Sequence, residues 1–126
     1  MSSMCPSIVV KPDGQDGKMR VAFVSGAAGG SRITSGTAYV LARMMFFNED
    51  PKVAGDAFRI HHQLLPEELV FERETPRKLL DDLRRRGHIN QTERAVMSVV
   101  QSIKVQKDGQ LLANADFRRP SDVDGL

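Results

Sequence analysis

The sequence predicts a layered α+β fold, and three features of its 126 residues lead to this prediction. Two pairs of strand-like segments lie toward the two ends of the chain. Three helix-like segments and one further strand-like segment lie between them. A run of small residues over 25–34 joins the first strand pair to the first helix. Because alternating apolar residues indicate strands and a spacing of three or four indicates helices, we expect sheet and helices to pack as separate layers.

The first strand pair is expected over 7–11 and 18–25. The first segment is short and rich in β-branched residues, and apolar side chains alternate along the second. The linking segment 12–17 contains Pro, Asp and Gly, which are typical of turns. These features predict an antiparallel hairpin.

The segment 25–34 is expected to be a turn with an exposed backbone. Gly26 to Gly30 are all glycine or alanine, so their N–H groups can approach a negatively charged ligand closely. Two interpretations are open: an anion-binding turn, and a tight turn that only brings the next helix close to the hairpin. A nucleotide-binding loop is disfavoured because the spacing fits neither the G-x-G-x-x-G pattern nor a P-loop.

The helix expected over 34–47 is apolar on nearly every face and carries Arg43 as its only charged residue. A helix that is apolar all round is normally buried on all sides. We therefore expect it to pack against something larger than the hairpin. If this chain is studied in isolation, the same helix is expected to leave apolar surface exposed.

A second, short helix is expected over 52–58, with Val53, Ala54 and Ala57 on one face. The residues before it, 48–51, include Asn and Pro and end the first helix. The segment 69–72 is β-rich and is predicted to be a strand.

The next helix carries the clearest start and stop signals. Thr75 is expected as its N-cap and Pro76 as its first helical residue, and Gly87 is expected to end it. Its leucines share one face, and three consecutive arginines in its last turn compensate the helix dipole.

The end of the chain predicts a second hairpin and a tail. The β-rich segment 96–105 is followed by a Lys-Asp-Gly turn and the short apolar segment 111–113. Residues 114–126 are polar and are expected to form an extended C-terminal tail. The length fits one domain, so 1–126 is expected to be a single domain.

Composition excludes several classes of function. The net charge is +2, from 18 basic and 16 acidic residues that are well mixed along the chain, so no nucleic-acid partner is expected. No apolar run approaches the roughly 18 residues of a membrane span, and no membrane segment is expected in this chain. The single cysteine, Cys5, cannot form an intrachain disulfide and is expected to be a small buried residue.

Two further motifs have simple interpretations. The adjacent pair His61-His62 would place its rings on different sides of a strand or helix, so a hydrogen-bonded structural pair is favoured and no metal site is expected. Asn90-Gln91-Thr92 fits the N-glycosylation sequon, which matters only for a chain that is exported.

Six motifs in order along the chain resemble the C-terminal part of the small subunit of the γ-glutamyltransferase (glutathione hydrolase) family. No single motif is diagnostic, but the ordered set covers almost the whole chain. The motifs are Ser2-Ser3-Met4-Cys5-Pro6, Gly26-Ala27-Ala28-Gly29-Gly30-Ser31-Arg32-Ile33, Arg59-Ile60-His61-His62-Gln63-Leu64-Leu65-Pro66, Gly87-His88, Val99-Val100-Gln101-Ser102-Ile103 and Asp116-Phe117-Arg118-Arg119-Pro120-Ser121-Asp122.

The resemblance implies a partial N-terminal-nucleophile hydrolase with an αββα sandwich, and hence a single, incomplete domain. It implies cleavage of the γ-glutamyl amide of glutathione and transfer of the γ-glutamyl group to water or to an amino acid or peptide acceptor, without a cofactor. Gly29 and Gly30 match the glycines whose amides form the oxyanion hole. Ser2 and Ser3 match the serines that hold the substrate's α-carboxylate.

The resemblance also implies missing parts. The family's nucleophilic threonine lies upstream of the serine pair, and the large subunit of the same precursor completes the site, so this chain alone is expected to be inactive. The family implies a location on the outer side of the plasma membrane, or secretion. The alternative is a non-catalytic, truncated product that acts only by protein interaction.

Overall fold

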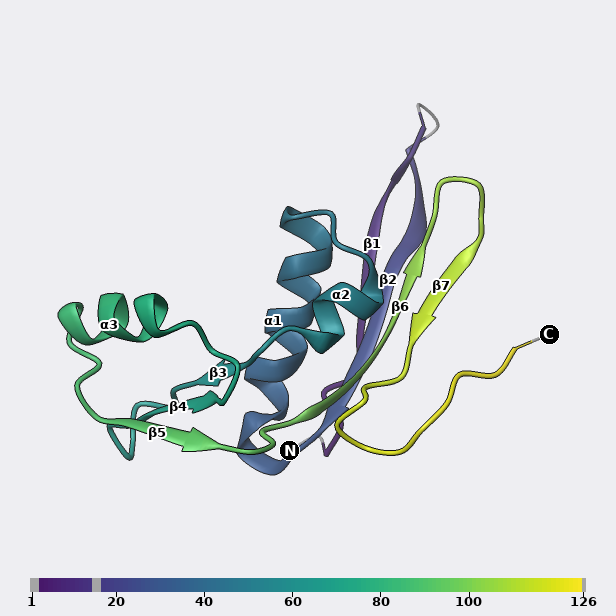
Figure 1. Ribbon diagram of the computed structural model, residues 1–126. Helices are drawn as coiled ribbons and strands as arrows, with labels where there is room; N and C mark the ends of the chain where they lie inside the picture. The colour runs from purple at the N-terminus through teal and green to yellow at the C-terminus, as the bar shows by residue number, and fades with distance from the viewer. Residues whose placement is uncertain (1–2, 15–16, 126) are drawn as a thin grey trace. The chain divides into compact units, whose positions relative to one another are not determined.

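The computed structural model describes residues 3–14 and 17–125 (Figure 1). The chain divides into two compact units, of which the first comprises Met1–Asp56 and Ser98–Leu126 and the second Ala57–Met97. Each unit contains both strands and helices, which confirms the predicted α+β class. The single, incomplete domain stays a prediction.

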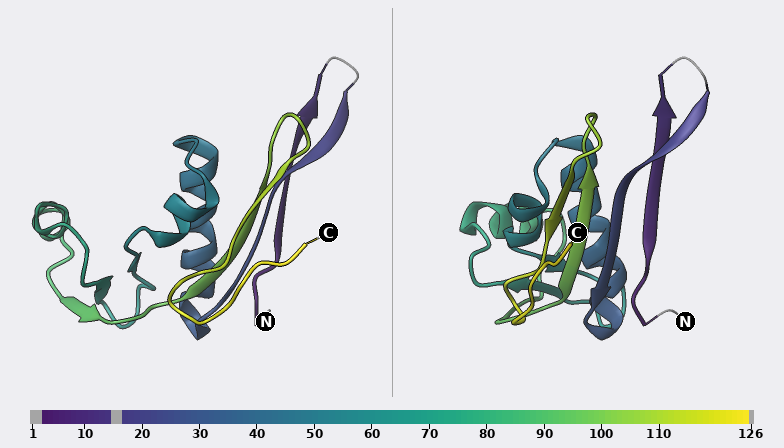
Figure 2. Two further views of the ribbon diagram at one scale, coloured as in Figure 1. Left: turned by 45° about the vertical axis from the view of Figure 1, so that its right-hand side comes forward. Right: turned by 90° about the vertical axis from the view of Figure 1, so that its right-hand side faces the viewer.

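The first unit contains a four-stranded antiparallel sheet with the order β1-β2-β6-β7 (Figure 2). Its strands are β1 (Ser7–Asp13), β2 (Lys18–Ala28), β6 (Val99–Val105) and β7 (Leu111–Asn114). Both predicted hairpins are therefore confirmed, as β1–β2 and β6–β7. The pairing of β2 with β6 joins the two hairpins, which lie far apart in the sequence.

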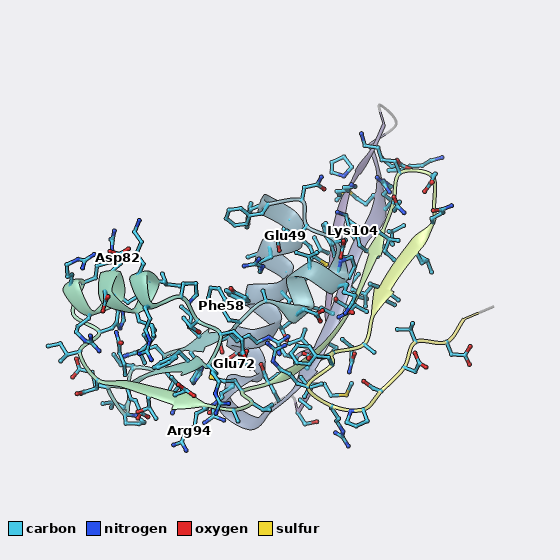
Figure 3. All side chains as sticks on the ribbon, in the orientation of Figure 1. Glu49, Phe58, Glu72, Asp82, Arg94 and Lys104 are labelled. Atoms are coloured by element: carbon cyan, nitrogen blue, oxygen red, sulfur yellow. The ribbon has the colours of Figure 1, made fainter. Side chains whose placement is uncertain are left out.

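Two helices, α1 (Ile33–Phe46) and α2 (Pro51–Asp56), cover one face of this sheet (Figures 1 and 2). A core of buried apolar side chains forms between them and the central strands. Its members are Ala27, Ile33, Val40, Met44, Ala54 and Val100. The segment between the helices is tied to β6, because Lys104 Nζ donates to Asn48 Oδ1 at 3.1 Å and to the Glu49 carbonyl at 3.2 Å (Figure 3).

The described residues bury only part of the surface of α1. The helix buries one face, with Val40 and Met44 at most 1% exposed, whereas Phe46 and Phe47 at its end are 77% and 74% exposed. The sheet and α2 contact only part of the helix surface. The expected exposure of apolar surface is confirmed at these two phenylalanines.

Two predicted details of this unit are wrong. The strand β2 continues to Ala28, because Gly26 and Ala27 pair with β6, so the predicted turn over 25–34 is shortened. In α2, Ala54 and Gly55 are buried but Val53 is 51% exposed. A Cβ atom on Gly55 would lie 2.5 Å from Asn114 Nδ2, so α2 meets β7 through its small residues.

The second unit contains a three-stranded sheet with the order β3-β4-β5. Its strands are β3 (Ile60–His61), β4 (Leu69–Glu72) and β5 (Gln91–Arg94), with β3 antiparallel and β5 parallel to β4. The helix α3 (Arg77–Arg85) connects β4 to β5 and packs Leu80 with Leu69 and Phe71. The strand over 69–72 is confirmed, whereas β5 was not predicted. In the first unit, β6 begins three residues later than expected.

The start of α3 differs from the prediction, and its end agrees. Pro76 is the N-cap, with an extended ψ of 131°, and it makes no side-chain capping bond because the proline ring has no polar atom to accept one. Thr75 is 5% exposed, and its Oγ1 has no hydrogen-bond partner among the described residues, so it does not cap the helix. Gly87 ends the helix with a φ of 106°, as predicted, and His88 N–H donates to the Leu83 carbonyl at 3.0 Å.

None of the helices in the described part of the chain has the length and apolar character needed to cross a membrane.

Candidate functional site

The candidate site begins where β2 ends. Gly29 and Gly30 follow Ala28 directly, and a single 3-10 turn, Gly30–Arg32, leads into α1. The glycine carbonyls are used by this turn, since Arg32 N–H donates to the Gly29 carbonyl at 3.3 Å and Ile33 N–H donates to the Gly30 carbonyl. Within the part of the chain that the structure describes, the N–H groups of Gly29 and Gly30 have no hydrogen-bond partner. Both residues are exposed.

Backbone conformation explains why both residues are glycine. Gly29 has a φ of 144° and Gly30 a φ of 63°, in the region that L side chains rarely adopt. A Cβ atom on Gly30 would meet no heavy atom within 4 Å, so crowding does not require glycine there. Successive backbone N–H groups in tight turns can form concave arrangements that bind anions.

The N-terminal segment lies beside this end of β2. Ala27 N–H donates to the Met4 carbonyl at 2.8 Å, and a Cβ atom on Gly26 would lie 3.6 Å from the same oxygen. The structure thus brings Ser3, a predicted site residue, close to the strand that leads into the glycine pair. Ser2, its predicted partner, lies outside the described residues.

An open groove of about 410 Å³ lies on the sheet beside Ser3. Most of its lining is apolar, and the polar groups that line it include the side chains of Ser3, Gln101 and Arg119. The remaining lining residues come from the N-terminal segment, β2 and β6: Met4, Pro6, Val24, Ser25, Gly26, Ala27, Ala28, Val99, Ser102 and Ile103. Such a groove, apolar with a few polar groups, is typical of small-molecule sites.

Arg119 was not identified as a site residue from the sequence. It is the one charged residue among the described lining residues, so the groove is electrostatically suited to an anionic ligand. The only sequence signal for Arg119 was its place in the Asp116-to-Asp122 motif of the tail. The strand residues with which it lines the groove, on β2 and β6, lie far from it in the sequence.

A buried acid–base pair fixes the tail that carries Arg119. Asp116 is fully buried and accepts hydrogen bonds from Val100 N–H at 2.8 Å and from Arg118 Nη1 at 3.2 Å. Arg118 also donates to the Gly55 carbonyl at 2.8 Å, which connects the tail to α2. Arg119 N–H donates to the Asp116 carbonyl at 3.2 Å, so this anchor sets the position of Arg119 at the groove.

Arg43, near the end of α1 and away from the groove, has a shifted pKa. Partial burial lowers the pKa of Arg43, but its hydrogen bonds to Glu49 and Tyr39, and its charge interactions with both, outweigh burial and raise the pKa above its ordinary value. Arg43 Nε lies 2.7 Å from Glu49 Oε2. This pair stabilises the helix end and has no contact with the candidate site.

The histidines of the second unit form structural contacts. His61 is 6% exposed, and its Nε2 lies 3.0 Å from Gln63 Oε1. His62 Nδ1 accepts a hydrogen bond from Leu64 N–H at 3.1 Å, and its ring meets that of His88 edge-on at 5.0 Å. Over residues 3–14 and 17–125, no three His, Cys, Asp or Glu side chains form a group that could hold a metal ion.

The described chain offers little at the groove that could start a covalent reaction. Thr37 and Thr75 are buried, and no threonine of the described residues lines the groove. Gly29 and Gly30 are not among the described lining residues either, since the lining from this part of the chain ends at Ala28.

Comparisons with known proteins agree on one family. The family model described as Gamma-glutamyltranspeptidase matches residues 1–126. The chain is 41% identical over 125 residues to Scoloptoxin SSD20 of Scolopendra dehaani, which covers 99% of this chain and 61% of that protein. It is 36% identical over 123 residues to the glutathione hydrolase proenzyme of Escherichia coli (strain K12), which covers 98% of this chain and 20% of that protein.

The fold agrees with the same comparison. The gamma-glutamyltranspeptidase from Pseudomonas nitroreducens complexed with L-DON superimposes with a TM-score of 0.80 and 32% identity, over 100% of this chain and 63% of that chain. The chain thus spans less than two thirds of each of these proteins. The α+β arrangement of this chain is the N-terminal-nucleophile hydrolase fold of these transpeptidases.

Proposed function

Because this chain belongs to the gamma-glutamyltranspeptidase family, we propose that it supplies the C-terminal part of the small subunit of a glutathione hydrolase. The complete enzyme cleaves the γ-glutamyl amide of glutathione and transfers the γ-glutamyl group to water or to an amino acid or peptide acceptor. The observation that carries the proposal is the exposed glycine pair with two positive φ values, which directly follows Ala28, a residue that lines an apolar groove together with Ser3.

In the proposed reaction, Gly29 and Gly30 stabilise the transition state. A threonine hydroxyl from the rest of the enzyme attacks the γ-carbonyl carbon, its proton passes to the threonine's own α-amine, and the C=O π electrons move to the oxygen as the tetrahedral intermediate forms. The N–H groups of Gly29 and Gly30 donate to this oxyanion. When the C=O bond re-forms, the C–N bond breaks and the amine leaves with the proton that the α-amine returns, which gives the acyl-enzyme. One oxyanion donor contributes about 10² to 10³ in rate.

The same site binds the substrate through its α-carboxylate. Ser3 supplies a hydroxyl donor at the groove, and Ser2 supplies the second in the proposed arrangement. Arg119 adds positive charge at the groove, which favours a substrate that carries carboxylates.

The proposed partners follow from the composition of the site. The nucleophile and the remaining substrate contacts come from the rest of the small subunit and from the large subunit of the same precursor. The 126-residue chain alone is therefore inactive, and the complete enzyme acts on the outer side of the plasma membrane or after secretion. Phe46 and Phe47 are exposed here and offer apolar surface for those parts.

A chimeric enzyme tests the role of the glycine pair. In it, this chain replaces the matching segment of the E. coli glutathione hydrolase proenzyme, to which it is 36% identical. Gly30→Ala strains the backbone at a φ of 63° and misdirects an oxyanion donor, so kcat for a chromogenic γ-glutamyl anilide should fall by about 10² while KM changes little.

Gly14→Ala is the matched control. Gly14 has a φ of 65° and open space around its Cβ position, so the substitution imposes the same strain of about 1–2 kcal/mol in the β1–β2 turn. This control should leave kcat unchanged. An active chimera whose kcat falls equally in both variants, or in neither, contradicts the proposed oxyanion role.

A non-catalytic product that acts only by protein interaction is the alternative, and the exposed apolar end of α1 fits this function as well as it fits the enzyme. The chimera separates the two functions. Turnover in the chimera supports the enzyme, whereas a processed, folded chimera without turnover supports the alternative.

A further inference from the structure

The loop between α3 and β5 carries a sequon that the proposed catalytic function does not use. We propose that Asn90 is an N-glycosylation site, modified when the chain passes through a eukaryotic secretory pathway. Asn90-Gln91-Thr92 fits the acceptor pattern, in which the residue between Asn and Ser/Thr is not proline. The site lies wholly within the second unit.

Asn90 stands at an accessible place in the fold. It is exposed and directly precedes β5, which is an edge strand of the three-stranded sheet. Its backbone carbonyl accepts a hydrogen bond from Leu69 N–H at 2.8 Å, which fixes the residue at the start of the β4–β5 pairing. A large polar modification here leaves the sheet core, formed by Leu69, Phe71 and Leu80, untouched.

The hydrogen bonds of the sequon are compatible with a sugar. Asn90 Nδ2 donates to the Glu67 carbonyl at 3.1 Å, which uses one of its two hydrogens. Attachment of a sugar replaces only one hydrogen, so the other can keep this bond. Thr92 Oγ1 donates to the Glu68 carboxylate, which holds the third residue of the sequon in the folded chain without use of the Asn90 side chain.

The attachment reaction balances with a defined donor. A eukaryotic oligosaccharyltransferase supplies an oligosaccharide linked through a diphosphate to a polyprenol lipid. Asn90 Nδ2 forms a bond to C1 of the first sugar, and the bond from C1 to the diphosphate oxygen breaks. The lipid diphosphate leaves with the electron pair, and Nδ2 loses one proton.

The surroundings of Asn90 favour a glycan. A small groove of about 160 Å³ beside it is lined by His62, Glu67, Gly87, His88 and Ile89. Ile89 is 70% exposed, so the next residue in the chain presents apolar surface at the same place. A glycan is bulky and solubilising and would cover this surface.

The test uses the full 126-residue chain with a cleavable secretion signal, expressed in cultured insect cells. A second sequon in a flexible C-terminal tag reports that each molecule has entered the secretory pathway. Glycans are counted in whole-cell lysate by the mobility shift on enzymatic deglycosylation, and occupied asparagines are identified by mass spectrometry after deglycosylation in heavy-oxygen water. The proposal does not rest on catalysis, so an inactive enzyme does not affect this result.

The wild-type chain should carry two glycans, one of them on Asn90. Asn90→Gln and Thr92→Ala should each lose one glycan. Thr92→Ser is the matched control and should keep both, because serine retains the hydroxyl that the sequon requires. Chains with an occupied tag and an unmodified Asn90 would overturn the proposal.

Discussion

The contact between α1 and β6 gives a prediction whose size follows from the structure. Gly36 is buried in the first turn of α1, and a Cβ atom there would lie 2.3 Å from Ser98 Oγ, 3.2 Å from Ser98 Cβ and 3.3 Å from Val100 Cγ2. In an open helix, Gly→Ala would stabilise by about 1 kcal/mol. Overpacking of this kind costs about 1–3 kcal/mol, so Gly36→Ala should destabilise the contact by up to about 2 kcal/mol.

A double-mutant cycle isolates this contact. Ser98→Gly removes the two nearest atoms, so Gly36→Ala in that background should be neutral or stabilising, with a coupling energy of about 1–3 kcal/mol. Any cost from the other interactions of Ser98 cancels in the cycle. The assay is native-state hydrogen exchange of the β6 peptide in the chimeric enzyme, which reports the free energy of local opening. Equal effects of Gly36→Ala in both backgrounds would refute the reasoning.

Three further predictions concern the isolated chain and the tail. The purified 126-residue chain should release no chromogenic amine from a γ-glutamyl anilide; turnover above that of a Gly29→Val, Gly30→Val variant would contradict this. The same chain should aggregate, because Phe46 and Phe47 are 77% and 74% exposed. In a sedimentation assay, more of a double Phe46→Ser, Phe47→Ser variant should stay in the supernatant. A monodisperse wild-type monomer with cooperative unfolding would count against this prediction. In the chimeric enzyme, Arg118→Met should destabilise the tail by about 3–5 kcal/mol, because it leaves the fully buried Asp116 without its cation. Adding Asp116→Asn should restore part of this stability. Proteolysis of the tail measures both effects, and equal cleavage rates for wild type and Arg118→Met would show that the pair is not an anchor.

Local patterns predicted those parts of the fold whose stability is decided locally. The two hairpins of the first unit follow from alternation and from turn residues, and the end of α3 follows from Gly87, whose φ of 106° suits glycine. The strand β5 was missed because its sequence, Gln-Thr-Glu-Arg, has no apolar alternation. It forms because it pairs with the buried strand β4, which supplies the apolar contacts.

The cap of α3 and the face of α2 were mispredicted for tertiary reasons. Thr75 has a typical N-cap identity, but its side chain is buried, and the helix starts one residue later than the signal indicates. In α2 the largest apolar side chain, Val53, faces outward. The helix buries Ala54 and Gly55 instead, and a Cβ atom at position 55 would displace the Asn114 amide, whose Nδ2 would lie 2.5 Å away. Neither distance can be read from the sequence.

The candidate site was predicted in part, and by a different kind of signal. Gly29, Gly30 and Ser3 were identified because their motifs resemble a family, and composition alone left the glycine pair with two interpretations. Arg119 was missed because its place at the groove depends on the buried Asp116, sixteen residues beyond Val100 in the chain. A long-range anchor of this kind leaves no periodic pattern in the sequence.

The glycines near the start of α1 differ in the space around them. Close packing of α1 on the sheet requires glycine at Gly36, where a side chain would overlap Ser98, and this residue lies outside the segment 25–34. At Gly30 a side chain would meet nothing, so packing does not account for the residue. The φ values of 144° at Gly29 and 63° at Gly30, which L side chains rarely adopt, explain why both positions are glycine. The anion-binding role proposed for the pair is a separate inference, because a strained turn and a site for an anion both use glycine.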